Sequence, residues 1–353
     1  MTRDYSAFLS SQDAPKAEVP FLTKLGWQPF FAQQTDADEM VENPPARVTQ
    51  VHRNSLHVMG EGIDMTVPMV SDVTVGDWVL LDQTSVARVL DRKSLIKRRA
   101  AGHDRSVQLI AANLDTAFMV TSCNDDFSVA RLERYIALAF EADVAPVILL
   151  TKKDLCEDLD SYIAQAQSIS KDVPVLAVNS TSDEPAALLA PWTNTGQTIA
   201  FLGSSGVGKS TLVNALSGEM AAETQSVREA DSKGRHTTTH RHLHIMPSGC
   251  AVLDTPGMRE LQITDAASGV AEVFADLFEL STQCKFNDCA HETEPGCAVQ
   301  RALKAGEIDE ARYARWKKLD AEEKFNSTSL SERRINDKAF HKRIKQIQKR
   351  NKK

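Results

Sequence analysis

The octapeptide GSSGVGKS at residues 203–210 limits the possible folds of this chain more than any other feature, because of where it lies. It fits the pattern G-x-x-x-x-G-K-[ST] and follows an apolar run, TIAFLG at 198–203, typical of a buried strand. A strand, this loop and a helix in succession predict a phosphate-binding loop. Such a loop usually opens its domain, yet roughly 200 residues precede it here. The fold must therefore give those residues a place ahead of the loop.

The loop residues have distinct chemical roles. The glycines let backbone amides curl around phosphate oxygens, Lys209 neutralises the β- and γ-phosphates during catalysis, and the Ser210 hydroxyl binds Mg²⁺. We predict that the nucleotide contacts Gly203, Ser204, Ser205, Gly206, Val207, Gly208, Lys209, Ser210 and Thr211.

The second half of a phosphate site follows in the motif DTPG, residues 254–257, after the apolar residues AVL. We predict that Asp254 enters the magnesium shell, directly or through water, and that the Gly257 amide contacts the γ-phosphate. Between the two motifs, KGRHTTTH at 233–240 is typical of a switch loop, in which Thr238 would cap Mg²⁺.

Base recognition is predicted from two segments that come before the phosphate loop. TKKD at 151–154 ends an apolar run and resembles the GTPase motif [NT]-K-x-D, with Thr151 at its first position. Asp154 would accept both donors of guanine, a pair that adenine lacks, and Lys152 would pack along the ring. VNSTS at 178–182 supplies Ser180 as a second base contact. The order base, base, phosphate, switch, magnesium predicts a circularly permuted GTPase that binds GTP and GDP.

Hydrophobic patterning predicts a multidomain protein. Residues 1–45 are acidic and are interpreted as an extension or linker with one short ordered piece near FLTKLGW. Residues 46–102 contain short β-rich segments and predict an OB-type barrel, with a basic trailing edge suited to RNA. That edge comprises Arg88, Arg92, Lys93, Lys97, Arg98 and Arg99. Residues 103–265 alternate strands and helices as in a doubly wound α/β domain, with the clearest helix at Val129 to Glu141.

A cluster of cysteines and one histidine follows the predicted GTPase domain. Its spacing is C-x4-C-x-H-x5-C, and its members are Cys284, Cys289, His291 and Cys297. Four such ligands predict one closed, structural Zn²⁺ site, within a helical domain at 266–330 built from helices at 270–280 and 308–325. The alternative is that the cluster consists of three buried thiols and an unrelated histidine. We expect Cys123, Cys156 and Cys250, which lie outside the cluster, to be buried thiols of this kind.

Composition sets limits on location and partners. The sequence lacks an apolar run of 18 residues and an N-terminal segment with the apolar core of a signal peptide, so we expect a cytoplasmic protein without membrane contact. Net charge is −7, but residues 331–353 carry +8, which leaves −15 for residues 1–330. Such a basic tail favours binding to a phosphate backbone, and the alternative is a solvated, frayed end.

The residue that orients the attacking water is not evident. Many GTPases use a glutamine shortly after the D-x-x-G motif, but Met258 stands after Gly257 and cannot polarise water. His236 in the switch segment is our candidate for this catalytic role, and an RNA-facing histidine is the alternative. Intrinsic turnover should be slow and should depend on another residue or on a partner.

Taken in order, GSSGVGKSTLVNAL, GRHTTTH, DTPGMRE and the cysteine cluster resemble the circularly permuted ribosome small-subunit-dependent GTPase A family of bacteria. The resemblance extends from about residue 45 to the end and includes QLIAANLDTAFMV before the first base motif. It implies an OB barrel, a permuted GTPase and a zinc domain. It further implies binding to the small ribosomal subunit and its rRNA in late maturation, with GTP hydrolysis stimulated by the subunit and coupled to release.

We expect the protein to be a monomer. Two other functional classes remain open from the sequence. A P-loop kinase or ATPase acting on a small molecule would require that both base motifs be coincidental. A non-catalytic RNA-binding scaffold, ordered by its nucleotide, would be consistent with Met258.

Overall fold

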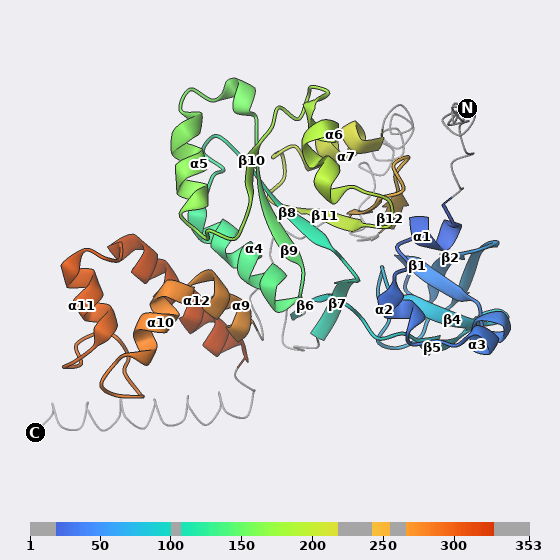
Figure 1. Ribbon diagram of the computed structural model, residues 1–353, viewed down its shortest axis with the longest axis horizontal. Helices are drawn as coiled ribbons and strands as arrows, with labels where there is room; N and C mark the ends of the chain where they lie inside the picture. Colours follow the sequence, from blue (N-terminus) through green and yellow to red (C-terminus); the bar gives the residue numbers. More distant parts are fainter. Residues whose placement is uncertain (1–18, 100–106, 218–241, 255–265, 328–353) are drawn as a thin grey trace, which may run out of the picture.

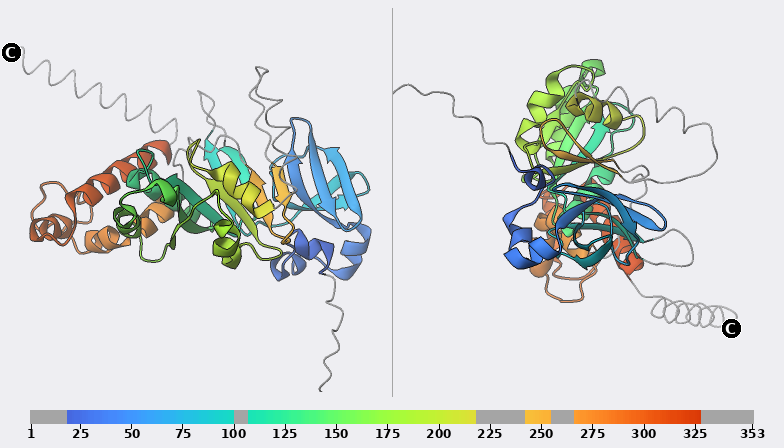
Figure 2. Two further views of the ribbon diagram at one scale, coloured as in Figure 1. Left: turned by 90° about the horizontal axis from the view of Figure 1, so that it is seen from above. Right: turned by 90° about the vertical axis from the view of Figure 1, so that its right-hand side faces the viewer.

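The computed structural model describes residues 19–99, 107–217, 242–254 and 266–327. Three parts follow one another along its long axis (Figures 1 and 2). An N-terminal group of strands and short helices forms one end, an α/β body occupies the centre, and C-terminal helices form the other end. No described helix is long and apolar enough to cross a bilayer.

The N-terminal part is an antiparallel sheet covered by short helices. β1 pairs with both β2 and β4, β2 pairs with β3, and β4 pairs with β5. Alternate residues of β2 are buried, as the alternating sequence predicts, and its inward side chains Leu56 and Val58 enter the core. The bounds are β1 Pro45–Val51, β2 Ser55–Gly60, β3 Ile63–Pro68, β4 Trp78–Asp82 and β5 Ser85–Val89.

The segment before β1 is more ordered than predicted. Instead of one short ordered piece it forms three helices, α1 Phe21–Lys24, α2 Pro29–Ala32 and α3 Ala37–Glu42. Leu25 and Phe31 are buried with Trp78, Leu80 and Leu90 in a common core. Isolated apolar residues in a mainly polar stretch gave no periodic signal for these helices.

Arg47 links elements of the N-terminal part to one another and to the central body. Its guanidinium is buried, donates to the carbonyl oxygens of Leu25, Gly76 and Asn113, and lies 5.8 Å from the Trp78 ring centroid. Burial is the main cause that lowers the pKa of Arg47, to about 10. A charge buried in this way is tolerated because its donors are satisfied by carbonyls.

The central sheet has parallel strands in the order β10, β9, β8, β11, β13, followed by antiparallel β12. The apolar runs at 116–121, 146–151, 173–178, 198–203 and 251–254 in the sequence predict its five parallel strands and are confirmed, because strands buried on both faces are nearly continuously apolar. The strands are β8 Thr116–Ser122, β9 Ala145–Thr151, β10 Val175–Ala177, β11 Thr198–Leu202, β12 His242–Ile245 and β13 Ala251–Asp254. A separate pair, β6 Leu95–Arg99 and β7 Val107–Ala112, lies beside them.

Helices cover both faces of this sheet, as predicted for a doubly wound fold. Helix α4, Val129–Glu141, has the predicted bounds and packs with α5, Leu159–Gln167, on the face that carries Met119 and Ile148. The opposite face, with Phe118 and Val147, packs against α6 and α7. The remaining central elements are η2 Lys153–Leu155, α6 Glu184–Leu189, η3 Ala190–Trp192 and α7 Lys209–Ser217.

The N-terminal and central sheets are continuous. β12 pairs antiparallel with β1 through Gln50 and His242, whose side-chain Nε2 atoms lie 3.0 Å apart. β12 also pairs with β13, so that one sheet of eleven strands runs through both parts. The strand β12 and its pairing with β1 were absent from the sequence prediction.

The C-terminal helices are α9 Ala267–Val273, α10 Ala275–Thr282, α11 Ala298–Ala305 and α12 Glu310–Ser327. The single helix predicted at 270–280 is divided at Phe274, whose φ of −112° and ψ of 39° break the helical path. Helix α9 lies against α4, where Gly269 permits close approach: a Cβ there would sit 2.0 Å from the Ala137 carbonyl oxygen. Arg315 on α12 donates to the buried Glu133 of α4 at 2.9 Å.

Candidate nucleotide site and cysteine–histidine cluster

The candidate nucleotide site begins where β11 leads into α7. Gly203 follows the last residue of the buried strand, and a Cβ at this position would lie 2.1 Å from the Val120 carbonyl oxygen, so only glycine fits beside β8. Lys209 opens α7 and its Nζ donates to the carbonyl oxygens of Gly203, at 2.8 Å, and Ser204. The predicted strand, loop and helix are therefore present in the predicted order.

The segments predicted to read the base lie at the same edge of the sheet, because β9, β10 and β11 are parallel and the motifs follow their carboxyl ends. A cavity of about 400 Å³ is lined by both sets of residues. Of the predicted residues it includes Lys152, Asp154, Ser180, Ser205, Gly206, Gly208, Lys209, Ser210 and Thr211.

Thr151, Gly203, Ser204 and Val207 are not among the residues that line this cavity. Thr151 is fully buried, and its Oγ1 donates to the Val207 carbonyl at 2.6 Å and lies 3.3 Å from that of Thr121. Its hydroxyl thus joins the first base segment to the phosphate loop. The structure gives Thr151 a positioning contact beneath the cavity.

Three lining residues, Leu155, Asn179 and Thr181, were missed by sequence reasoning. The side chain of Asn179 accepts from the amide of Thr181 at 3.0 Å and from its hydroxyl at 2.7 Å. This local turn is typical of Asn before small polar residues, which is the signal that could have identified both. Leu155 is 76% exposed next to Asp154, an unusual place for a large apolar side chain.

Glu184 at the start of α6 holds the second base segment in place. One of its oxygens accepts from Lys153 Nζ and the other from the Asn179 amide at 3.2 Å. The Lys153 hydrogen bond, followed by that of the Asn179 amide, lowers the pKa of Glu184. Two loops that follow different strands are thereby linked across the cavity rim.

The magnesium and switch residues are described only in part. Asp254 is the last residue of β13, and Leu253 before it pairs with Ala200 of β11, so the backbone of Asp254 lies at the edge from which the phosphate loop emerges. His236, Thr238 and Gly257 lie outside the described residues. Their predicted roles remain predictions.

The cysteine–histidine cluster lies between α10 and α11. One ligand atom from each of Cys284, Cys289, His291 and Cys297 lies within 4.8 Å of all the others. The Sγ atoms of Cys284 and Cys297 are 3.8 Å apart, and His291 Nδ1 lies 3.5 and 3.6 Å from them. Two thiolates at about 2.3 Å from one tetrahedral zinc ion would be separated by about 3.8 Å. The donor set and its spacing thus fit Zn²⁺.

Contacts around the cluster hold the histidine in place. Tyr313 of α12 donates to the His291 carbonyl at 2.6 Å, and Gln300 of α11 donates to the same oxygen at 2.7 Å. The Ala298 amide donates to Cys284 Sγ at 3.3 Å. Such surrounding hydrogen bonds are typical of built metal sites.

The two segments predicted to contact the base precede the phosphate loop in the sequence, although all three lie at one edge of the sheet. This order defines a circularly permuted P-loop GTPase. A family model described as RsgA GTPase matches residues 89–264. This chain belongs to the RsgA GTPase family. A second model, described as ABC transporter, matches residues 192–343, a stretch that contains the phosphate loop common to many nucleotide-binding families.

The relatives match along most of their length. A protein of Vibrio parahaemolyticus named small ribosomal subunit biogenesis GTPase RsgA 2 is 46% identical over 92% of this chain and 92% of its own. A small ribosomal subunit biogenesis GTPase RsgA of Mesorhizobium japonicum is 47% identical over 89% of this chain and 93% of its own.

Solved structures agree on the fold. The crystal structure of YjeQ from Thermotoga maritima matches with a TM-score of 0.57 at 25% identity, over 78% of this chain and 96% of that one. YloQ, described as a circularly permuted GTPase, matches with a TM-score of 0.57 at 24% identity, over 84% of this chain and all of that one.

Proposed function

We propose that this protein is a GTPase that binds the small ribosomal subunit, acts in its late maturation and leaves after hydrolysing GTP. The observation that carries the proposal is the cavity shared by the phosphate loop and the two base segments, in a chain whose relatives are named small ribosomal subunit biogenesis GTPases. The protein would act as a monomer in the cytoplasm, without a membrane partner.

Within the site, different residues would bind the phosphates, the base and the magnesium ion. Loop amides from Gly203 to Gly208 and the Lys209 ammonium would bind the phosphates, after Lys209 leaves the two loop carbonyls it now contacts. The exposed Asp154 would bind guanine, with Lys152 and Leu155 beside it. Ser210, Asp254 and Thr238 would hold Mg²⁺, which would neutralise charge on the phosphates. His236 is the candidate for orienting water, and Gly257 for contacting the γ-phosphate.

The flanking parts would supply the RNA contacts. We infer an OB-type barrel at 46–102 after the extension at 1–45, a GTPase domain at 103–265, a zinc domain at 266–330 and a basic tail at 331–353. The basic edge of the barrel is less available than its sequence suggests, because three of its charges are paired. Arg88 pairs with Glu39 at 2.8 Å, Arg92 with Asp77 at 2.7 Å and Lys93 with Asp115 at 2.5 Å. Lys97, Arg98 and the tail are the better candidates for rRNA.

The test is steady-state phosphate release from GTP and from ATP, with and without purified small ribosomal subunits, at low and moderate salt. The proposal expects turnover of GTP alone to rise strongly with the subunit and the stimulation to fade as salt rises. Equal use of ATP would favour a P-loop ATPase or kinase. Tight GTP binding without turnover under any condition would favour a non-catalytic scaffold.

A further inference from the structure

A second cavity lies at the other end of β9 from the nucleotide site. Its volume is about 530 Å³, and it contains the first residues of β9, whereas the nucleotide cavity follows the last. A seven-residue strand separates the two by about 20 Å. Walls come from the central body and from α9, so the cavity lies at the junction of the central and C-terminal parts. Nothing in the proposed GTP chemistry uses it.

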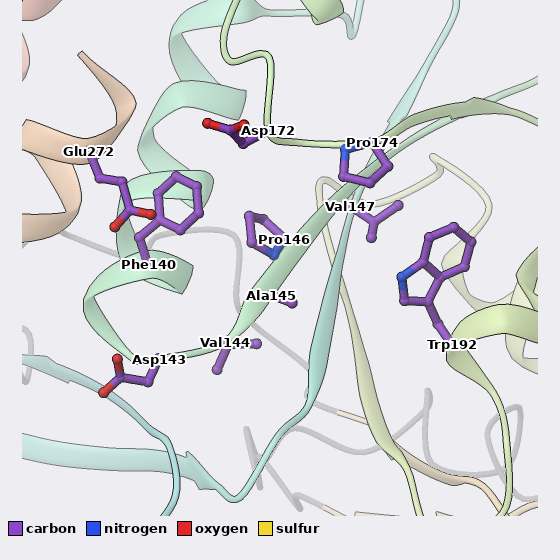
Figure 3. A pocket seen from close by; sticks show the side chains of 10 residues that line it. All are labelled: Phe140, Asp143, Val144, Ala145, Pro146, Val147, Asp172, Pro174, Trp192 and Glu272. Carbon is purple, nitrogen blue, oxygen red and sulfur yellow. The ribbon is translucent and has the colours of Figure 1, made fainter. Parts of the chain in front are cut away.

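Three carboxylates stand around this cavity without a basic residue among its lining. Figure 3 shows Asp143, Asp172 and Glu272 arranged around Phe140 and Pro146. Among the described residues, none of the three has an ion pair with a lysine, arginine or histidine. Burial and then the charges of Asp172 and Asp143 raise the pKa of Glu272. The lining of the cavity therefore carries a negative potential that no basic side chain within it offsets.

Local structure strengthens this potential at Asp143. The residue follows the C-terminus of α4, where the helix dipole already presents partial negative charge, and an acid there is unfavourable. Its φ of 56° lies in the left-handed region, which glycine enters at lower cost. Asp143 thus occupies a position where both helix capping and electrostatics would favour another residue.

The third carboxylate is fixed by the junction between the two parts. Glu141 of α4 accepts from the Ser268 hydroxyl at 2.7 Å and from the Gly269 amide at 3.1 Å, which seats the start of α9 on α4. Glu272 follows Ser268 by four residues and so lies one turn along the same face. The position of Glu272 is therefore set by the packing of α9 on α4.

The shape and lining of the cavity indicate the chemistry of its occupant. Phe140, Pro146, Pro174 and Trp192 supply flat apolar surfaces, and the Trp192 ring is supported by an edge contact with Phe118. Within the described chain, only the cysteine–histidine cluster brings three potential metal ligands within reach of one ion, so these carboxylates are too far apart to share one. Separated acids beside flat apolar surfaces fit a guanidinium, which is planar, stacks on rings and donates in several directions.

We propose that this cavity is a docking site for arginine side chains of a basic polypeptide segment on a partner protein. RNA is the wrong class of partner, because three carboxylates would repel its phosphates. The proposal goes beyond the proposed GTPase function and does not depend on it, since the cavity is separate from the nucleotide site.

The experiment measures fluorescence anisotropy of a labelled ten-residue peptide of alternating arginine and glycine, titrated with the full-length protein. The test variant combines Asp143→Asn, Asp172→Asn and Glu272→Gln. Its matched control combines Glu61→Gln, Glu279→Gln and Glu307→Gln, three exposed acids outside the cavity, so that both change net charge equally. We expect the test variant to weaken binding by roughly tenfold or more, since an exposed charge pair contributes up to about fivefold, and the control to weaken it by less than about threefold.

Three further measurements complete the test. A lysine version of the peptide should bind the wild type more weakly than the arginine version, because ammonium groups stack poorly. Equal weakening by the two triple variants, or tighter binding of a ten-nucleotide oligouridine than of the peptide, would overturn the proposal. So would a large gain in peptide affinity when the lysines and arginines of residues 342–353 are replaced by glutamine, because the chain's own tail would then be the occupant.

Discussion

Replacing Thr151 by valine should weaken nucleotide binding without changing which base is preferred. The two side chains have nearly the same shape, and valine is favoured in a strand, so β9 should remain intact. The change removes the hydroxyl that donates to the Val207 carbonyl at 2.6 Å. Thr151 is completely buried and Val207 is 1% exposed, so water cannot easily replace the lost donor.

The magnitude follows from the cost of leaving a buried carbonyl without its donor, about 1–3 kcal/mol. If losing the hydrogen bond displaces the phosphate loop, this free energy corresponds to a loss of roughly 5- to 150-fold in GDP affinity. If the loop instead keeps its place, the same cost appears as a lower free energy of unfolding. Titration of labelled GDP and urea denaturation of the same variant measure the two parts separately.

Thr151→Ser is the matched control, because it keeps the hydroxyl and should bind GDP within about threefold of the wild type. The ratio of GDP to inosine diphosphate affinity should be the same for the wild type and Thr151→Val, since the side chain lies beneath the cavity. The reasoning is refuted if Thr151→Val matches the wild type in both GDP affinity and stability. A change in the base ratio would equally contradict a role limited to positioning.

Three further outcomes are expected from other parts of the structure. Gly269→Ala should lower the free energy of unfolding by about 1–3 kcal/mol in urea denaturation, because its Cβ would meet the Ala137 carbonyl at 2.0 Å; Gly306→Ala, with open space around it, would lose stability only through its φ of 72° and is the comparison. Cys289→Ser should lower both the amount of bound zinc, measured by elemental analysis, and the melting temperature. Cys156→Ser, outside the cluster, should leave the amount of bound zinc unchanged. Burial lowers the pKa of His242 to about 4, with His244 as the next cause, so this histidine favours folding above the unfolded-state pKa of about 6.5 and progressively less as pH falls toward 4. His242→Gln should therefore lose less melting temperature than the wild type between pH 7 and pH 5; an equal loss would contradict this assignment.

The central body could be predicted because its elements carry strong local signals. β8, β9 and β11 are apolar on both faces, and α4 presents one continuous apolar stripe, so sequence and structure agree on Val129–Glu141. The division at Phe274 was missed because apolar spacing continues across the junction of α9 and α10. Helices α2 and α3 were not predicted, because four to six residues are too few to show helical periodicity.

The candidate site was predicted to a similar extent and for a similar reason. Glycine spacing and the position of a motif after a strand are local, and they brought Asp154, Ser180 and Lys209 to one cavity. The direction in which a side chain points depends on the tertiary structure and not only on its neighbours in the sequence. Thr151 contacts the phosphate loop because the loop that follows β11 reaches past β8 to the end of β9. No spacing in TKKD encodes that contact.

The pairing of β1 with β12 has a consequence for any attempt to divide this protein. A cut between residues 99 and 107 would separate the N-terminal strands from the central body and break two pairings, that of β1 with β12 and that of β6 with β7. Each fragment would then carry strands that have lost a partner, with unpaired amides and carbonyls: β1 and β6 in one and β7 and β12 in the other. Such open edges recruit strands from other molecules, so isolated fragments should self-associate, although the intact chain keeps both edges closed by their mutual pairing.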